Sequence, residues 1–357
     1  MTEIHVAFLW HMHQPWYLLP DSAEAALPWV RLRAAKDYHD MARHLQSTGF
    51  PCTVNFVPSL TEQLRRLSLG EVWDPFLPGG AKEAEEAVRS GLIPMPLAGR
   101  GLVPPATFGR AEDLWTWFFL SWTAQTALEE DPRAERFRQP FSPTERDVEE
   151  LERWQKELVS AVLPLYRALA SSGQIELTTT PFYHPILPLL WDTQVAKRAR
   201  PADEVPLFQA PTDAEEQARR ALSHHREVFG RKPWGMWPAE GAVSPEALAL
   251  LADLGVGWVA TDGAILAHTL GRPPSPSELY QPWRLRFGAK EIAVVFRDTI
   301  LSNLLSFTYG SWSTEQAVED LKDQCNRNQE KCMAQLLGLG CKTIGYLASR
   351  SVHFGIC

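Results

Sequence analysis

Three carboxylates in this sequence stand where short apolar runs end. Glu240 closes WGMWPAE, Asp262 closes GWVATD, and Asp298 closes EIAVVFRD directly after Arg297. If each run is a strand of one parallel barrel, its last residue lies at the carboxyl edge, where barrel enzymes carry their active residues. A pair of carboxylates there suits glycoside hydrolysis, in which one attacks the sugar and the other donates and then accepts a proton. Retention of configuration requires the pair to lie about 5–5.5 Å apart.

Histidine and tryptophan side chains accompany these carboxylates. His11, His13 and Gln14 follow the first apolar run, His184 follows the third, and Trp237 lies within the fourth. The His-x-His pair could instead bind a metal, as in metal-dependent carbohydrate deacetylases. We expect the side chains of His11 and His13 to point to opposite faces of an extended chain, which disfavours joint ligation. The sequence therefore predicts no metal site.

Short apolar runs alternate with helical patterns along the chain. Near-continuous apolar runs of this length indicate strands buried on both faces of a parallel sheet. A strand–helix alternation with about seven strands favours a (β/α) barrel, complete or nearly so, with a doubly wound open sheet as the alternative. The runs are IHVAFLW (4–10), CTVNFV (52–57), IELTTT (175–180), WGMWPAE (234–240), GWVATD (257–262), EIAVVFRD (291–298) and KTIGYLA (342–348). The weakest is WGMWPAE, because Pro238 cannot donate to a sheet.

Helix signals mark the segments between the runs. Apolar residues at helical spacing over 144–171 predict a helix that a Ser142–Glu145 capping box opens. Further helices are predicted to open near 212, 244 and 313. Residues 68–143 interrupt this rhythm with Pro, Gly and aromatic residues. We expect them to form an inserted, partly helical segment, in which Trp115, Trp117 and Trp122 favour core packing over a sugar platform.

Composition excludes several classes of function. The 357 residues carry a net charge of −8, which disfavours a nucleic-acid partner. No apolar stretch is long enough to span a membrane, and the N-terminus shows no secretory signal, so we expect a cytoplasmic protein. Neither G-x-G-x-x-G nor G-x-x-x-x-G-K-[ST] occurs, so no nucleotide and no other cofactor is predicted.

Four segments, in order, resemble the motifs of glycoside hydrolase family 57. They are HMHQPW, GQIELTTTPFYHPILPLL, GMWPAEGAVS and FRDTILSNLLSFTY, and they span residues 11–309. That family contains α-amylases, amylopullulanases, 4-α-glucanotransferases and α-glucan branching enzymes, and GMWPAEGAVS is most similar to the amylopullulanase-like members. The resemblance implies an incomplete, seven-stranded (β/α) barrel followed by a helical region.

The resemblance also implies roles for single residues. Glu240 would be the nucleophile and Asp298 the general acid/base. His13 and His11 would lie against the sugar in the cleaved subsite, and His184 belongs to the second motif. The full set expected to bind substrate is His11, His13, Gln14, His184, Trp237, Asp262 and Arg297.

The chain departs from the family pattern in two places. Asn303 stands where the fourth motif usually has a carboxylate, and Ser306 where it usually has a glycine. The fifth motif does not follow, four of the five cysteines fall after residue 324, and proline ends at 282. We therefore expect a catalytic barrel domain over 1–322, with the insertion at about 68–143, and an atypical tail over 323–357. By this hypothesis the tail is truncated or frameshifted and most of the family's helical region is missing.

The predicted function is retaining hydrolysis of α-glucans at α-1,4 or α-1,6 bonds. Transfer to another glucan, as in a 4-α-glucanotransferase, uses the same site. A catalytically impaired glucan-binding protein is another alternative, and a metal-dependent carbohydrate deacetylase is a less favoured one. The expected partner is an α-glucan oligo- or polysaccharide.

Overall fold

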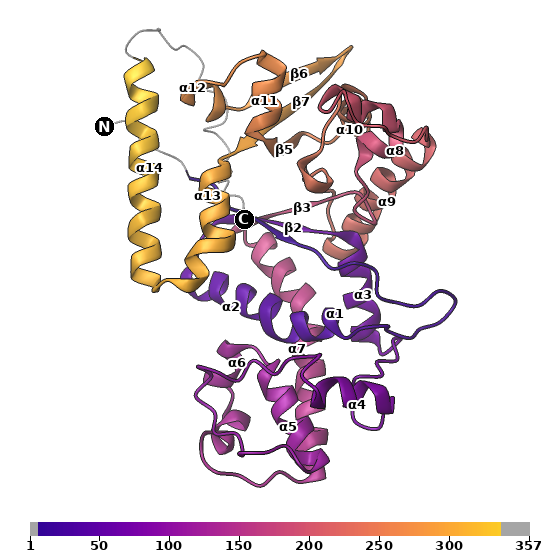
Figure 1. The fold of residues 1–357 in the computed structure, drawn as a ribbon, viewed down its shortest axis with the longest axis vertical. Helices are drawn as coiled ribbons and strands as arrows, with labels where there is room; N and C mark the ends of the chain where they lie inside the picture. Colours follow the sequence, from indigo (N-terminus) through magenta and orange to yellow (C-terminus); the bar gives the residue numbers. More distant parts are fainter. Residues whose placement is uncertain (1–5, 337–357) are drawn as a thin grey trace. The chain divides into compact units, whose positions relative to one another are not determined.

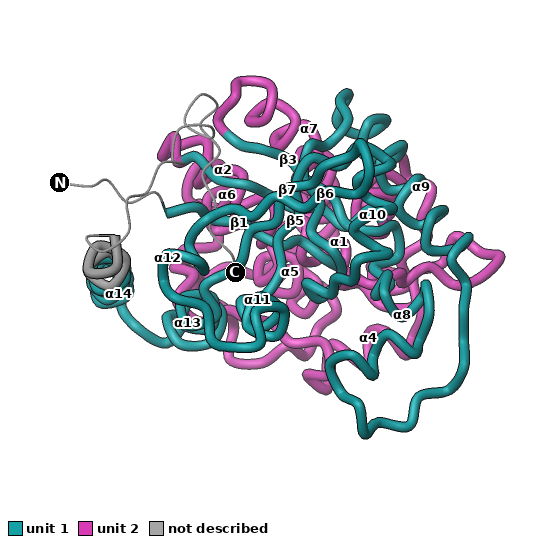
Figure 2. Tube along the Cα trace, turned by 90° about the horizontal axis from the view of Figure 1, so that it is seen from above, with its two compact units in different colours: residues 1–13, 51–58, 175–357 teal, residues 14–50, 59–174 magenta. Residues whose placement is uncertain are grey.

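The computed structural model of the chain describes residues 6–336, which form two compact units. Unit 1 takes residues 1–13, 51–58 and 175–357, and unit 2 takes residues 14–50 and 59–174 (Figure 2). The chain thus passes from unit 1 into unit 2 twice, near residues 13 and 58. No described helix is both long and apolar enough to cross a membrane.

Unit 1 is built around a seven-stranded sheet in the order β1-β2-β3-β4-β5-β7-β6 (Figure 1). All neighbours pair in parallel except β6 and β7, which form an antiparallel hairpin. Within residues 6–336 no pairing joins β1 to β6, so the barrel is incomplete, as the sequence predicted. The strands are β1 (Leu9–Met12), β2 (Cys52–Phe56), β3 (Ile175–Thr179), β4 (Gly235–Met236), β5 (Trp258–Asp262), β6 (Trp283–Phe287) and β7 (Lys290–Arg297).

Six predicted strands are present, and one strand was missed. The β4 strand is only two residues long, because the chain turns at Pro238 into a short 3-10 helix, Ala239–Gly241. The missed strand is β6, whose side chains alternate between half-buried and exposed. It joins β7 through a tight turn in which Gly288 adopts a φ of 59°, a conformation that suits glycine. The predicted strand at 342–348 lies outside the described residues.

Helices of unit 1 follow the strands and bury an apolar face on the sheet. Predicted helix starts near 212, 244 and 313 are confirmed, and Ser244 caps its helix by accepting from the Ala247 N–H. Leu222, Leu251 and Val259 belong to the apolar core that these helices share with β4, β5 and β7. The helices are α8 (Leu187–Trp191), α9 (Pro211–Phe229), α10 (Pro245–Asp253), α11 (Gly263–Leu270), α12 (Pro276–Leu279), α13 (Thr299–Asn303) and α14 (Thr314–Leu336).

Two histidines of α9 lie in the interior of unit 1. His224 and His225 are both buried, and His225 is only 2% exposed. Its Nδ1 lies 2.9 Å from the carbonyl oxygen of Arg231, just past the end of α9. The buried face of α9 therefore includes both imidazoles, which the apolar spacing of the helix alone does not indicate.

Unit 2 is helical and has its own core. The predicted helix over 144–171 is present as α7, although its cap is Thr144 with Asp147 and not Ser142 with Glu145. Trp115, Trp117 and Trp122 are buried, so they pack in this core as expected. The α-helices are α1 (Trp29–Arg33), α2 (His39–Thr48), α3 (Pro58–Leu69, whose first residue belongs to unit 1), α4 (Lys82–Arg89), α5 (Ala111–Ser121), α6 (Gln125–Glu130) and α7 (Glu145–Ser171).

Candidate active site

The carboxyl end of β1 brings His11 to a fixed position in unit 1. His11 pairs in register with Asn55 of β2, and its Nδ1 lies 2.7 Å from the Asn55 Oδ1. The Asn55 amide donates to the Thr178 Oγ1 at 3.1 Å and to the Thr179 carbonyl at 2.7 Å. Because both amide protons of Asn55 are used by β3, the atom that Asn55 presents to His11 is its oxygen, which accepts a hydrogen bond. The His11 proton therefore lies on Nδ1, and Nε2 is left with a free lone pair.

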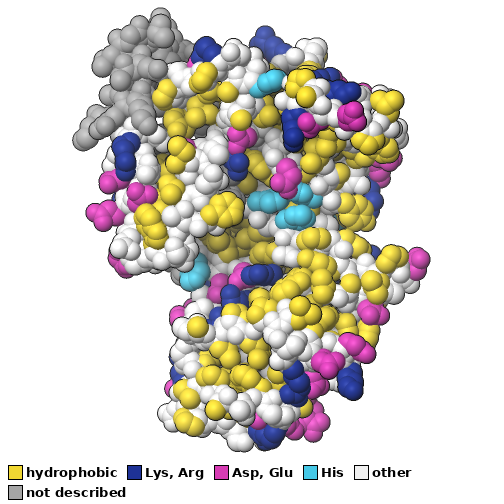
Figure 3. Space-filling model, in the orientation of Figure 1, with side chains coloured by type: hydrophobic (Ala, Val, Ile, Leu, Met, Phe, Trp, Pro, Cys, Tyr) yellow, Lys and Arg dark blue, Asp and Glu magenta, His cyan; other side chains and the backbone are white. Residues whose placement is uncertain are grey.

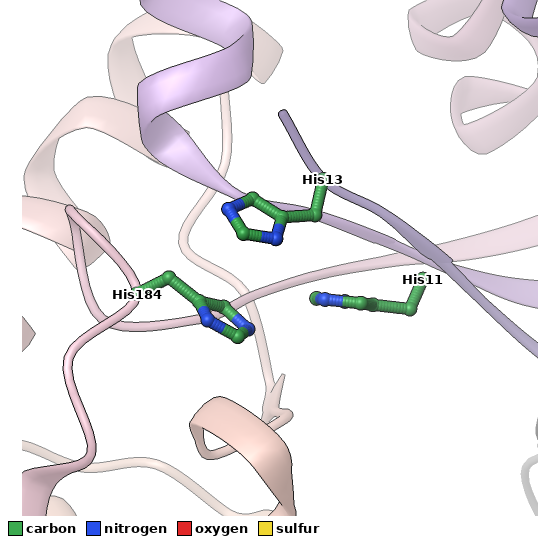
Figure 4. Close-up of side chains that lie close together, drawn as sticks. All are labelled: His11, His13 and His184. Atoms are coloured by element: carbon green, nitrogen blue, oxygen red, sulfur yellow. The ribbon is translucent and has the colours of Figure 1, made fainter. Parts of the chain in front are cut away.

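His13 and His184 complete a group of three imidazoles with His11 (Figure 4). The ring centroids of His13 and His184 are 4.3 Å apart, and those of His11 and His184 are 5.2 Å apart. The expectation that His11 and His13 point to opposite faces is wrong. Residues two apart share a face of a strand, and His13 moreover lies beyond the end of β1 at Met12.

Burial governs the charge of this cluster. It lowers the pKa of His11 to about 4 against the opposing Asn55 hydrogen bond, and it lowers the pKa of His13 as well. Burial and the two neighbouring imidazoles lower the pKa of His184 to about 3. The three rings are therefore uncharged at neutral pH and can act as both hydrogen-bond donors and acceptors.

Glu240 projects from a strained turn at the end of β4. Its φ is 56° and its ψ is 17°, in the left-handed region that a residue other than glycine seldom occupies. Gly241 holds this turn in place, because its N–H donates 2.8 Å to the Pro238 carbonyl and its own carbonyl accepts from the Thr261 hydroxyl. The Glu240 side chain is 71% exposed, and its Oε1 lies 3.8 Å from the Nδ1 of His184, which is 8% exposed. His184 itself has a φ of 59°.

The strained backbone is informative because such conformations collect at functional sites. Both of these residues were singled out by the sequence, and the structure brings them together. Trp237, two residues after β4 begins, is mostly buried and lies with its ring centroid 6.3 Å from that of His11. Figure 3 shows histidine side chains grouped at the surface on this face, with an acidic side chain beside them.

A second group of site residues lies at the ends of β5 and β7. Asp262 and Arg297 face each other in register, and the Arg297 Nε donates 2.6 Å to the Asp262 Oδ2. Asp262 also caps α11 through the Ala264 N–H and accepts from the Thr299 hydroxyl at 3.1 Å. Burial raises the pKa of Asp262, but the Ala264 N–H and Arg297 outweigh it and hold that pKa below its ordinary value. Asp262 is therefore a charged residue that fixes the position of Arg297.

Asp298 begins α13 and is held by three donors. Its Oδ1 accepts from the Leu301 N–H at 2.9 Å. Its Oδ2 accepts from the Tyr280 hydroxyl at 2.7 Å and from the Asn328 amide at 3.0 Å. Sequence motifs did not single out Tyr280 or Asn328, because the first follows α12 and the second lies on α14. The N-cap position of Asp298, by contrast, is visible in the sequence Asp-Thr-Ile-Leu.

The predicted site residues thus fall into two groups and one outlier. His11, His13, His184, Trp237 and Glu240 gather at the ends of β1, β3 and β4, and the remaining group lies at the ends of β5 and β7. Gln14 belongs to unit 2, where its amide donates to the Tyr38 hydroxyl at 3.2 Å. Asn55, Tyr280 and Asn328 are further residues that support the site and were not predicted to belong to it.

Relatives of known identity match this chain. A 98-residue segment is 29% identical to α-amylase 1 of Dictyoglomus thermophilum, and a 154-residue segment is 24% identical to an α-amylase of Pyrococcus furiosus. These matches cover 28% and 43% of this chain but only 12% and 20% of the relatives, so the chain aligns with a small part of each.

Structure and family extend the match to nearly the whole chain. The fold is similar to that of an α-amylase from Thermotoga maritima, with a TM-score of 0.51 and 15% identity over 84% of this chain and 47% of the other. The sequence pattern of glycosyl hydrolase family 57 matches residues 7–350. With an incomplete barrel that carries histidines and carboxylates at its strand ends, the chain belongs to glycosyl hydrolase family 57.

Proposed function

We propose that this protein cleaves α-glucans with retention of configuration, with Glu240 as the nucleophile and Asp298 as the acid/base. The observation that carries the proposal is the Glu240 turn, in which a left-handed backbone presents an exposed carboxylate beside uncharged imidazoles. Among the described residues no Lys or Arg forms an ion pair with Glu240, and a purely structural carboxylate would not need a strained turn. Family membership and the α-amylase relatives support a glucan as the substrate.

The sheet places the two proposed carboxylates on either side of one strand. Glu240 follows β4, Asp298 follows β7, and β5 lies between them. Adjacent strands are spaced about 4.8 Å apart, so β4 and β7 themselves are about 10 Å apart across β5. Side chains directed toward each other across that gap can approach the about 5–5.5 Å that retaining glycosidases require.

The proposed reaction is a double displacement. A Glu240 oxygen attacks the anomeric carbon while Asp298 gives its proton to the glycosidic oxygen, so the glycosidic bond breaks and a glycosyl–Glu240 ester forms. Asp298 then removes a proton from water, whose oxygen attacks the anomeric carbon and releases Glu240. If a sugar hydroxyl replaces this water, the product is a transferred glucan. Hydrolysis and transfer therefore share every protein group.

The uncharged imidazoles suit the binding of sugar hydroxyls. A neutral ring can donate to one hydroxyl and accept from another, and it does not neutralise the nucleophile through a permanent ion pair. We propose that His11, His13 and His184 hold the sugar against Glu240, with Asn55 setting the orientation of His11. Arg297, whose Nε donates to Asp262, lies at the end of β7, one residue before Asp298.

The test compares Glu240→Gln and Asp298→Asn with the unmutated chain on maltooligosaccharides, amylose and pullulan. We expect turnover to fall by at least 1000-fold in the Glu240 variant, because the nucleophile is lost. Asp253→Asn, at the exposed end of α10, is the matched control and should keep full activity. Undiminished activity of Glu240→Gln would contradict the proposal. Glucan binding without turnover by the unmutated chain would instead identify a binding protein, and product analysis separates hydrolysis from transfer.

A further inference from the structure

The three imidazoles have the composition and geometry of a metal site. His11, His13 and His184 are the group of possible ligands found within the described part of the chain, and their ligand atoms all lie within 4.8 Å of one another. Figure 4 shows the three rings arranged around a common space. The donors come from the end of β1 and from the loop after β3, two neighbouring parts of unit 1 that the sheet fixes.

The separation of the donors is close to that of a bound ion. Tetrahedral zinc has Zn–N distances of about 2.0–2.1 Å, which places two ligand nitrogens about 3.4 Å apart. Donors at most 4.8 Å apart therefore need to shift by on the order of 1 Å each. A change in side-chain torsion supplies such a shift without moving the backbone.

Two further features prepare the rings for ligation. Asn55 fixes the proton of His11 on Nδ1, which leaves Nε2 as the ligand atom, and metal-binding histidines are commonly oriented in this way. The Nε2 of His184 is buried and has no hydrogen-bond partner among the described residues, although a buried polar atom ordinarily has one. A metal ion at the cluster would satisfy it.

We propose that His11, His13 and His184 bind a divalent transition-metal ion, zinc above all, and that this ion competes with the glucan. Three nitrogen donors favour zinc or copper over calcium or magnesium, which take oxygen ligands. The Glu240 Oε1 lies 3.8 Å from the Nδ1 of His184 but outside the group of ligand atoms that lie within 4.8 Å of one another, so Glu240 would contact the ion through water. Binding of the ion stands apart from the proposed glucan activity, whereas competition rests on that proposed function.

The direct test is calorimetric titration of the full chain with zinc chloride. His184→Asn is the test variant, because asparagine tolerates the left-handed backbone that His184 adopts. His13→Ala is the second, and circular dichroism verifies that each variant is folded. His268→Ala, on the exposed surface of α11, is the matched control. We expect one zinc site to be lost, or weakened at least 100-fold, in both test variants and kept in the control.

The cysteines of the chain are other possible zinc ligands, so the difference between variants carries the answer. X-ray absorption should show nitrogen neighbours at about 2.0 Å that disappear in His184→Asn. If the stoichiometry and affinity are the same in His184→Asn and in the unmutated chain, the proposed site is refuted.

Competition is measured separately, with maltooligosaccharide turnover at several zinc concentrations. We expect zinc to raise KM without lowering kcat, calcium and magnesium to have no effect, and a chelator to restore activity. A zinc-bound chain with unchanged KM, or one that zinc activates, would refute competition. If the unmutated chain turns over no glucan at all, the proposed function fails, and calorimetry still decides the metal site.

Discussion

Gly235 of β4 lies against the indole ring of Trp258, and replacing it with alanine should disturb the strand that carries Glu240. A Cβ atom at Gly235 would lie 2.0 Å from the Trp258 Cε2 and 2.3 Å from its Cζ2. The ring is rigid and only 4% exposed, so it cannot rotate out of the way into solvent. Its Nε1 also donates 3.1 Å to the carboxyl of Glu176, whose pKa burial raises. Gly235→Ala must therefore move the indole, the strand, or both.

Two effects destabilise the Gly235→Ala variant and a third, smaller one stabilises it. Overpacking of a core costs about 1–3 kcal/mol. Loss of a buried hydrogen bond to a carboxyl group adds about 1–3 kcal/mol. The smaller unfolded-state entropy of alanine gives back about 0.4–1 kcal/mol. Together these predict a loss of roughly 1–5 kcal/mol in the free energy of unfolding.

Urea unfolding followed by circular dichroism measures this loss, and glucan turnover measures its effect on the site. Gly310→Ala is the matched control, since a Cβ there has no heavy atom within 4 Å and the residue has no positive φ. We expect the control to unfold like the unmutated chain, and Gly235→Ala to unfold at lower urea with at least tenfold lower kcat/KM. If the two variants have equal midpoints, the close approach of Gly235 and Trp258 does not constrain β4.

Three further predictions concern single side chains. Burial lowers the pKa of His225 to about 4, so below about pH 6.5 the unfolded chain binds a proton that the folded chain does not bind, and the free energy of unfolding falls as the pH falls from 6.5 towards 4. In urea titrations, His225→Gln should reduce the loss of stability between pH 7 and pH 5 by about 2 kcal/mol. An equal loss in the variant and the unmutated chain would contradict this. Glu240→Asn should abolish turnover yet raise the free energy of unfolding by about 0.5–1 kcal/mol, because asparagine suits the left-handed turn; a less stable variant would refute the strain. Tyr280→Phe removes a 2.7 Å hydrogen bond to Asp298 and should lower kcat/KM about tenfold in steady-state assays, whereas an unchanged value would show that Tyr280 does not support Asp298.

Much of the barrel could be predicted because its strands are encoded locally. The β2 strand, for example, is buried at every position, and three of its five residues, Cys52, Val54 and Phe56, are apolar. The long helix α7 is marked by its apolar spacing in the same way. Such elements bury one face or both against whatever surrounds them, so their sequence shows the pattern before any partner is known.

Other elements depend on partners that the local sequence does not show. The β6 strand carries arginines on its exposed face, and only its pairing with β7 makes it part of the sheet. His225 resembles a polar surface residue, yet the carbonyl of Arg231 accommodates it in the interior. In both cases a contact made after folding outweighs the local preference.

The candidate site shows the same division. The positions of Glu240, Asp262 and Asp298 followed from the ends of the predicted strands, because a parallel sheet brings these ends to one edge. The sequence did not show that Tyr280 and Asn328 hold Asp298, since Tyr280 follows α12, Asn328 lies on α14, and neither segment carries a motif. Backbone strain at Glu240 was equally hidden, because a φ of 56° follows from how the turn is held and not from the residue type.

The most direct test of the proposed chemistry is to trap the covalent intermediate. A fluorinated α-glucosyl fluoride, which forms the glycosyl–enzyme ester but releases it slowly, is incubated with the full chain, and the peptides are sequenced by mass spectrometry. We expect one added glycosyl group on Glu240, absent from the Glu240→Gln variant. A chain that turns over glucans while the label lies on another residue, or on none, would contradict the role of Glu240 as the nucleophile.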